Sequence, residues 1–183
     1  MIEKYLIEYC SPTLARLKTA NLFSISYTDR EELSSQISIC NQQLNEKGIY
    51  VTILRMGGEK ALIYVYRKSR LEKELQGRET SEFLASYGYE EFTETYAIAR
   101  LRERFSKRED FPHEIGVFLG YPLGDVKGFI QHQGRHYKCA GCWKVYQDEG
   151  EARKLFGKFR KCRAVYQELF QKGRSVWQLT VAA

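Results

Sequence analysis

Polar and conformationally special residues gather around a Gly-Tyr-Pro sequence within FPHEIGVFLGYPLGDVKGFI, residues 111–130. The apolar run at residues 115–119 predicts a buried strand, Gly120 and Tyr121 a tight turn, and Pro122 the start of a helix through residue 130. The unpaired N–H groups at a helix N-terminus bind phosphate or carboxylate readily. The segment therefore predicts a site for an anionic small molecule or a cofactor phosphate, and it identifies no particular cofactor.

The candidate ligand-binding residues around this turn are His113, Glu114, Gly120, Tyr121, Asp125 and Lys127. The alternative interpretation is structural: the glycines permit close packing of strand and helix, and Asp125 complements the positive end of the helix dipole. An acid–base pair of His113 with Glu114 is disfavoured, because neighbouring residues on a strand point to opposite faces.

A second group with chemical potential follows, in the pattern His136-x2-Cys139-x2-Cys142. A Cys-x2-Cys pair with a nearby histidine can hold zinc, and such a pair can also be redox active. However, zinc sites of this type usually have a second ligand pair, and redox-active pairs typically open a helix, whereas this one enters a predicted strand. The pattern favours ordinary cysteines, with a metal or redox protein as the alternative.

The net charge of +6 is concentrated near the C-terminal end of the chain. Residues 151–174 contain eight basic and two acidic residues, so the rest of the chain is neutral. The candidate partner-binding residues are Arg153, Lys154, Lys158, Arg160 and Lys161. They predict an interaction module for an acidic partner such as RNA, but the aromatic residues among them follow a buried helical stripe. That periodicity favours a solvated basic face over a nucleic-acid stacking platform.

Composition and motifs narrow the class of protein. With 43% hydrophobic and 28% charged residues, the chain is typical of ordinary globular proteins. No apolar run approaches the ~18 residues of a membrane helix, and the first residues lack a signal-peptide pattern. Five scattered cysteines predict reduced thiols and a cytoplasmic location. No Walker loop, nucleophile elbow or metalloprotease pattern is present, so no enzyme class is indicated.

Secondary-structure patterns predict an α+β fold that positions these residues. Strands are expected at residues 21–27, 49–56, 60–67, 137–147 and 176–181, and helices at 2–9, 28–47, 69–77, 80–88, 90–106 and 149–172. The order through residue 119 matches a ferredoxin-like split unit, after which a strand–helix pair is appended. We expect one domain over residues 1–183, with a mixed or mainly antiparallel sheet packed by helices.

Four segments carry a family resemblance: SPTLARLKTANLF (11–23), ALIYVYR (61–67), HEIGVFLGYPLGDVKGFI (113–130) and CWKVYQDEGEARKLFGKFRKC (142–162). Together they resemble an uncharacterised bacterial family, domain of unknown function 3793, found mainly in anaerobic Firmicutes. The resemblance implies a cytoplasmic protein of anaerobes, encoded in some genomes near flavodoxin or ferrous-iron transport genes. That setting mildly favours iron or redox chemistry and adds a flavodoxin-like protein to the acidic partners. It implies no activity, cofactor or catalytic residue.

Overall fold

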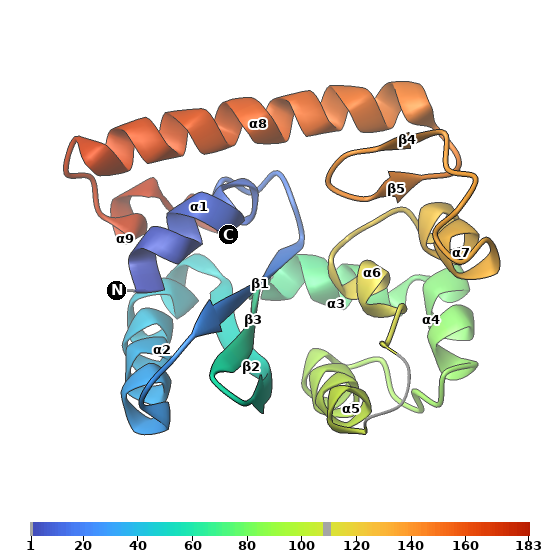
Figure 1. Ribbon diagram of the computed structural model, residues 1–183, viewed down its shortest axis with the longest axis horizontal. Helices are drawn as coiled ribbons and strands as arrows, with labels where there is room; N and C mark the ends of the chain where they lie inside the picture. Colours follow the sequence, from blue (N-terminus) through green and yellow to red (C-terminus); the bar gives the residue numbers. More distant parts are fainter. Residues whose placement is uncertain (1, 108–110) are drawn as a thin grey trace.

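The computed structural model describes residues 2–107 and 111–183 (Figure 1). The helices are α1 (Ile2–Leu14), α2 (Arg30–Leu44), α3 (Lys68–Gln76), α4 (Arg78–Ala85), α5 (Glu94–Ser106), α6 (Ile115–Phe118), α7 (Leu123–Gln131), α8 (Glu149–Gln171) and α9 (Val176–Leu179), with a 3-10 turn at Asn45–Lys47. The strands are β1 (Ala20–Ser26), β2 (Ile49–Gly57), β3 (Lys60–Arg67), β4 (Cys139–Ala140) and β5 (Lys144–Val145). Within the described ranges, no helix combines the length and apolarity needed to cross a bilayer.

Strands β1, β2 and β3 form an antiparallel sheet in the order β1-β3-β2. Helix α2 leads from β1 to β2 while β3 lies between them, which is a split β-α-β arrangement. The predicted α+β class and mainly antiparallel sheet are confirmed, and the sheet is not mixed. The full ferredoxin-like order is not confirmed, because the segment expected to supply its fourth strand forms α6.

Helix α6 forms because its backbone hydrogen bonds close locally. The N–H of Gly116 donates to the carbonyl of His113 at 3.2 Å, and that of Leu119 to Ile115 at 3.0 Å. Residues 115–119 are all buried, and a short run buried on every side carries no periodicity that separates strand from helix. The predicted strand–Gly-Tyr-Pro–helix unit is therefore corrected to two helices joined by that turn.

Two further predicted strands also differ from the structure. The strand expected at residues 137–147, the first part of the appended pair, is the short hairpin β4–β5, which forms a separate sheet. The expected edge strand at residues 176–181 is helix α9 with a C-terminal extension. Ser175 and Gln178 form a capping box that starts α9, and this local signal outweighs the strand propensity of the apolar residues.

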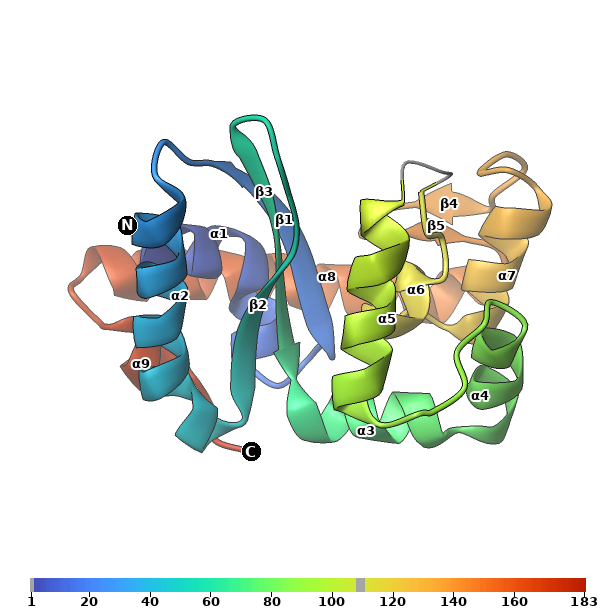
Figure 2. The same ribbon diagram turned by 90° about the horizontal axis from the view of Figure 1, so that it is seen from below.

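The sheet separates two hydrophobic cores (Figure 2). Because successive strand residues point to opposite faces, Ile63 and Val65 of β3 face the core shared with α1, α2 and α9, whereas Tyr64 and Tyr66 face the core of α3 to α7. A register shift between Ile53 and Arg55 in β2 changes which face its later residues point to. The alternation along β3 thus divides the buried residues into two cores, one on each face of the sheet.

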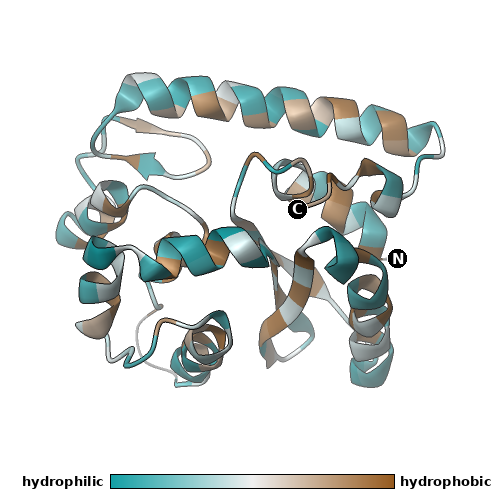
Figure 3. Cartoon of the chain, turned by 180° about the vertical axis from the view of Figure 1, so that it is seen from behind, coloured by the Kyte–Doolittle hydropathy of each residue, from teal (hydrophilic) through white to brown (hydrophobic). Residues whose placement is uncertain are grey.

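Helix α8 extends across both halves of the molecule (Figure 1) and alternates polar and apolar residues along its length (Figure 3). Near its start, Ala152, Phe156 and Phe159 pack with Trp143 and Val145 of the hairpin region in a third, smaller core. Farther along, α8 contacts α1, and its partly buried residues pack on the first core. The long C-terminal helix predicted from its stripe is confirmed.

Arg67, the last residue of β3, is only 1% exposed and joins segments far apart in the sequence. Its guanidinium donates to the carbonyls of Thr13 and Leu14 at 2.7 Å each, of Val181 at 2.7 Å and of Lys47 at 3.3 Å. These bonds satisfy carbonyl groups at the C-terminal end of α1 that have no partner within the helix. Burial lowers the pKa of Arg67 to about 10, so it stays charged at neutral pH.

We predict that Arg67→Met lowers the free energy of unfolding by about 3–5 kcal/mol, since it removes at once four hydrogen bonds from a charged group to backbone carbonyls. Urea denaturation followed by circular dichroism measures this loss. Arg78→Met is the matched control, because the side chain of Arg78 is 91% exposed and its pair with Glu82 contributes little. Equal stability of the two variants would contradict the structural role of Arg67.

Candidate functional site

The Gly-Tyr-Pro turn joins α6 to α7 and lies against the loop that follows α1. Gly120 has φ +72°, a left-handed conformation that favours glycine, and a Cβ there would lie 2.5 Å from Thr19 Oγ1. The Tyr121 ring stacks on Trp143 with centroids 4.8 Å apart, and its hydroxyl donates to the Cys142 carbonyl at 3.2 Å. Three segments therefore meet at the turn.

The two carboxylates expected near this turn are engaged inside the protein. Glu114 is fully buried, forms an ion pair with Arg104, and accepts a hydrogen bond from the Tyr89 hydroxyl at 3.2 Å. Asp125 is 3% exposed and accepts hydrogen bonds from Trp143 Nε1 at 2.8 Å and from two backbone N–H groups of the hairpin's end. Asp125 thus fastens α7 to the β4–β5 hairpin, which agrees with a structural role.

The remaining predicted residues do not complete a site at the start of α7. Exposed His113 packs between the rings of Phe111 and Phe129, and exposed Lys127 lies 5.8 Å from the centroid of the Phe83 ring. The side-chain amide of Gln147 occupies the space beside Gly124 in the first turn of α7. Of the six candidates, only Gly120 and Tyr121 line hollows around one basic side chain.

That side chain is Lys18, which lies in the loop between α1 and β1. A cavity of about 190 Å³, here called the Tyr121 cavity, has a polar lining of Lys18, Asn21, Tyr121, Cys142 and Arg163. Its walls come from α1, β1, α8, the end of α6 and the hairpin turn. A second hollow of about 390 Å³, here called the Arg70 cavity, is lined on its polar side by Lys18, Thr19, Arg70, Lys73, Glu74 and Thr80.

Lys18 is 7% exposed, and its ammonium donates to the Ala20 carbonyl at 2.7 Å. The ammonium also lies 5.1 Å from the centroid of the Tyr121 ring. Burial lowers the pKa of Lys18 from 10.5 to about 8; the thiols of Cys142 and Cys10 oppose this shift and Arg163 adds to it. Over residues 2–107 and 111–183, Lys18 forms no ion pair with a carboxylate.

Arg163 contributes a second positive charge to the Tyr121 cavity. Its Nε atom is buried and lacks a hydrogen-bond partner in the described part of the chain. Nearby, burial raises the pKa of Tyr121 to about 12, so its hydroxyl stays protonated and keeps its hydrogen bond to the Cys142 carbonyl. The cavity therefore combines two cations with neutral hydrogen-bonding groups, and its electrostatics suit an anion.

The His136, Cys139 and Cys142 pattern is not brought together as a ligand set. Cys139 is buried in the small core, whereas Cys142 is exposed at the hairpin turn. His136 has φ +57°, and its ring lies 6.0 Å from that of His132. Where the structure describes the chain, no three His, Cys, Asp or Glu side chains gather as metal ligands.

The basic residues of α8 divide into paired and unpaired ones. Arg153 pairs with Glu149 at 2.6 Å, and Lys154 with Glu151 at 2.7 Å. Lys158, Arg160 and Lys161 are exposed and have no ion pair among the residues described. The expected basic surface is therefore reduced to these three side chains.

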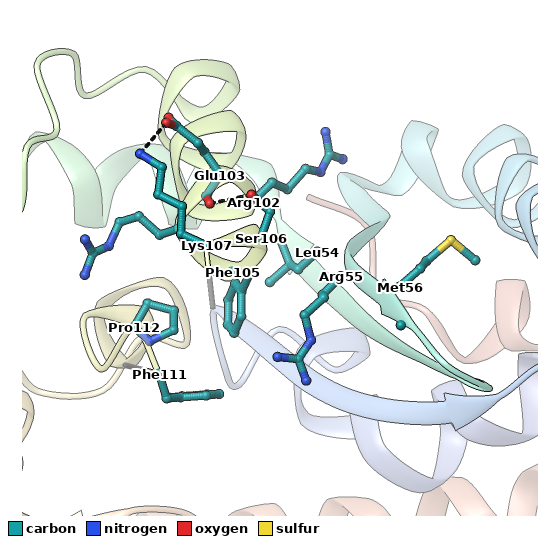
Figure 4. A pocket seen from close by; sticks show the side chains of 12 residues that line it. Leu54, Arg55, Met56, Arg102, Glu103, Phe105, Ser106, Lys107, Phe111 and Pro112 are labelled. Carbon is teal, nitrogen blue, oxygen red and sulfur yellow. Dashed lines mark hydrogen bonds and ion pairs between the residues drawn. The ribbon is translucent and has the colours of Figure 1, made fainter. Parts of the chain in front are cut away.

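A hollow of about 780 Å³ lies between β2 and the end of α5 (Figure 4). Many of its charged groups are already engaged: Lys107 pairs with Glu103 at 2.8 Å, and Arg102 donates to the Ile53 carbonyl at 3.0 Å. Lys107 and Phe111 in its wall flank residues 108–110, so the described chain does not define its full boundary. It carries no candidate site.

The sequence interpretation missed Lys18 and Arg163. Lys18 lies in a loop, where no periodicity indicates burial. Arg163 follows Phe156 and Phe159 by seven and four positions, so helical spacing places it on the buried face of α8. A basic residue on an apolar stripe was the available signal for an internal charge.

Comparison with known proteins identifies the family. The model of the family described as protein of unknown function (DUF3793) matches residues 6–180, so the chain belongs to this family, as the resemblance implied. Searches of curated proteins and of solved structures gave no match.

The contact between Gly120 and Thr19 generates a prediction. Gly120→Ala should lower the free energy of unfolding by about 2–4 kcal/mol, because a left-handed alanine is strained and its Cβ overlaps Thr19. Gly173→Ala is the control for strain alone, since Gly173 has φ +89° with open space around it, and it should cost about 1–2 kcal/mol. If denaturant titrations show the same loss of unfolding free energy for Gly120→Ala and Gly173→Ala, a Cβ at position 120 does not clash with Thr19.

Proposed function

We propose that this member of a family of unknown function binds a small anionic molecule in the Tyr121 cavity, held by Lys18 and Arg163. The observation that carries the proposal is the burial of the Lys18 ammonium without a carboxylate partner in the described chain. A buried charge is costly unless it is paired, and one backbone carbonyl provides only part of that compensation. A bound anion would supply the missing charge.

The composition of the cavity supports this assignment. Arg163 can form a bidentate pair with a carboxylate or phosphate, and its unpartnered Nε is one of the donors for such a pair. Asn21 and Tyr121 add neutral polar groups to the lining. The cavity has room for roughly six water molecules at about 30 Å³ each, so it suits a molecule of similar size.

The proposal keeps part of the expectation drawn from the sequence. The Gly-Tyr-Pro turn remains in the site through Tyr121, while Gly120 lines the neighbouring Arg70 cavity. The anion is held by side-chain cations, and the N-terminus of α7 plays no part. Gly120 is unsuitable for testing binding, because its replacement disturbs the fold.

We predict that acetate raises the thermal unfolding temperature of the wild-type protein and that Lys18→Met removes most of this shift. A ligand that binds only the folded state stabilises it by about 2.7 kcal/mol at a hundred times its dissociation constant. Lys158→Met is the matched control, because it removes an exposed lysine and should leave the shift unchanged.

The acetate effect should decrease as the pH rises through 8. Acetate stays ionised over this range, whereas Lys18, with a pKa of about 8, loses the charge that attracts it. Differential scanning fluorimetry at constant ionic strength measures the dependence. An equal shift in the wild type and in Lys18→Met would overturn the proposed site.

A second candidate function uses α8. Lys158, Arg160 and Lys161 are exposed without acidic partners in the described residues, whereas their neighbours Arg153 and Lys154 are paired. This contrast supports docking of an acidic partner, RNA or a flavodoxin-like protein, on the middle of α8.

Replacing both Lys158 and Lys161 with Glu should weaken binding to a polyanion such as heparin or RNA by at least about tenfold at low salt, because charge contacts dominate such binding. Arg153→Glu, at a position already paired with Glu149, is the comparison variant and should have a smaller effect. Retention on a heparin column across a salt gradient measures both. Retention that is insensitive to salt in the wild type would remove this function.

A further inference from the structure

The chemistry of the Tyr121 cavity narrows the class of its ligand. We infer that Lys18 forms an imine with a small 2-oxo acid, whose carboxylate is held by Arg163. This inference rests on the proposed anion site and adds a covalent step to it. It follows from the position of a primary amine, a guanidinium and neutral hydrogen-bonding groups around one small cavity.

Lys18 is placed as a nucleophile and not as an ordinary surface lysine. Its amine is held by one hydrogen bond to the Ala20 carbonyl, so nitrogen retains further hydrogen-bonding and bonding capacity on its other sides. The stacked Tyr121 and Trp143 rings and the apolar side chains of Leu119 and Phe159 bound its surroundings. Desolvated lysines in such settings form Schiff bases with carbonyl compounds.

The groups that face Lys18 set its protonation. They are Cys10 from α1, Tyr121 from the turn, Cys142 from the hairpin and Arg163 from α8, with Arg70, Lys73 and Glu74 of α3 across the Arg70 cavity. Because burial lowers the pKa of Lys18 to about 8, a substantial fraction of the amine is neutral slightly above neutral pH. An exposed lysine with an ordinary pKa of about 10.4 is almost wholly protonated there.

The reaction requires no oxidant or reductant. The lone pair of the neutral Nζ attacks the ketone carbon as the carbon–oxygen π bond breaks, and the proton that the nitrogen then releases passes to the oxygen to give a carbinolamine. The hydroxyl group leaves as water with a second proton, taken from solvent, and a protonated carbon–nitrogen double bond remains. The positive charge of Lys18 is thereby restored beside the carboxylate of the ligand.

Size and recognition fit a three-carbon 2-oxo acid. Pyruvate has about as many heavy atoms as the cavity has places for water, given its volume of about 190 Å³. Its carboxylate matches the planar donor pattern of the Arg163 guanidinium. The side-chain NH2 of Asn21 is the neutral donor available to the carbonyl oxygen, because the Tyr121 hydroxyl already donates to the Cys142 carbonyl.

The test is reductive trapping with pyruvate. Wild-type protein is incubated with pyruvate and sodium borohydride, and the modified lysine is located by peptide mass spectrometry. We expect one adduct per chain, on Lys18, with a yield that rises between pH 6.5 and 8.5 as the amine loses its proton. Lys158 and the other lysines in the same digest are internal controls for non-specific modification.

Two variants distinguish this inference from the anion site itself. Lys18→Arg retains the positive charge but cannot form an imine, so acetate should still stabilise it while trapping is lost. Lys18→Met should lose both responses, and urea denaturation establishes that each variant is folded. An acetate effect that depends on Lys18, without a borohydride adduct on Lys18, would overturn the imine and leave the anion site intact. If the wild-type protein shows neither acetate stabilisation nor a borohydride adduct, the anion site and the imine are both overturned.

Discussion

The buried guanidinium of Arg67 is the interaction on which the rest of this structure depends. It binds carbonyls at the end of α1, at Lys47 and at Val181, while its own backbone N–H donates to the Thr19 carbonyl at 2.9 Å. The loop that carries Lys18 and Thr19 is therefore fixed to the end of the central strand. Thr19 in turn contacts Gly120, so Arg67, through its guanidinium and its backbone N–H, orders both the end of the central strand and the wall of the candidate site.

Much of the fold could be predicted because the relevant signals are local. Two strand-like runs on either side of the Gly57-Gly58 turn indicated β2 and β3, and the apolar stripe of α8 gave its limits within a residue or two. The errors fall where periodicity disappears. Residues 115–118 are buried on all sides, so the same apolar run fits a strand or a helix. At residues 176–179, a capping box beside β-branched residues gave two conflicting local signals, and the cap determined the outcome.

The candidate site was predictable only in part. The Gly-Tyr-Pro turn lies beside the proposed cavity, and Gly120 is required there by its left-handed backbone and its contact with Thr19. Glu114 and Asp125 are buried with partners inside the protein, and sequence alone does not separate a buried structural carboxylate from a ligand-binding one. Lys18 could not be found from local pattern, because its burial results from α1, α8 and the hairpin meeting around it. A site formed by residues far apart in the sequence can be recognised only from the tertiary structure.

The hydrogen bonds of the Arg67 guanidinium join segments that leave the ribosome at different times. The carbonyl of Val181 lies 114 positions after Arg67 in the sequence. When the ribosome has released β1, β2 and β3, the guanidinium at the end of β3 still lacks that acceptor, and α8 has yet to pack on the first core. The split β-α-β unit therefore emerges as an incomplete intermediate with exposed apolar faces. Contacts of such long sequence separation slow folding, and the hydrogen bond from Arg67 to Val181 can form only after α8 and α9 have been synthesised.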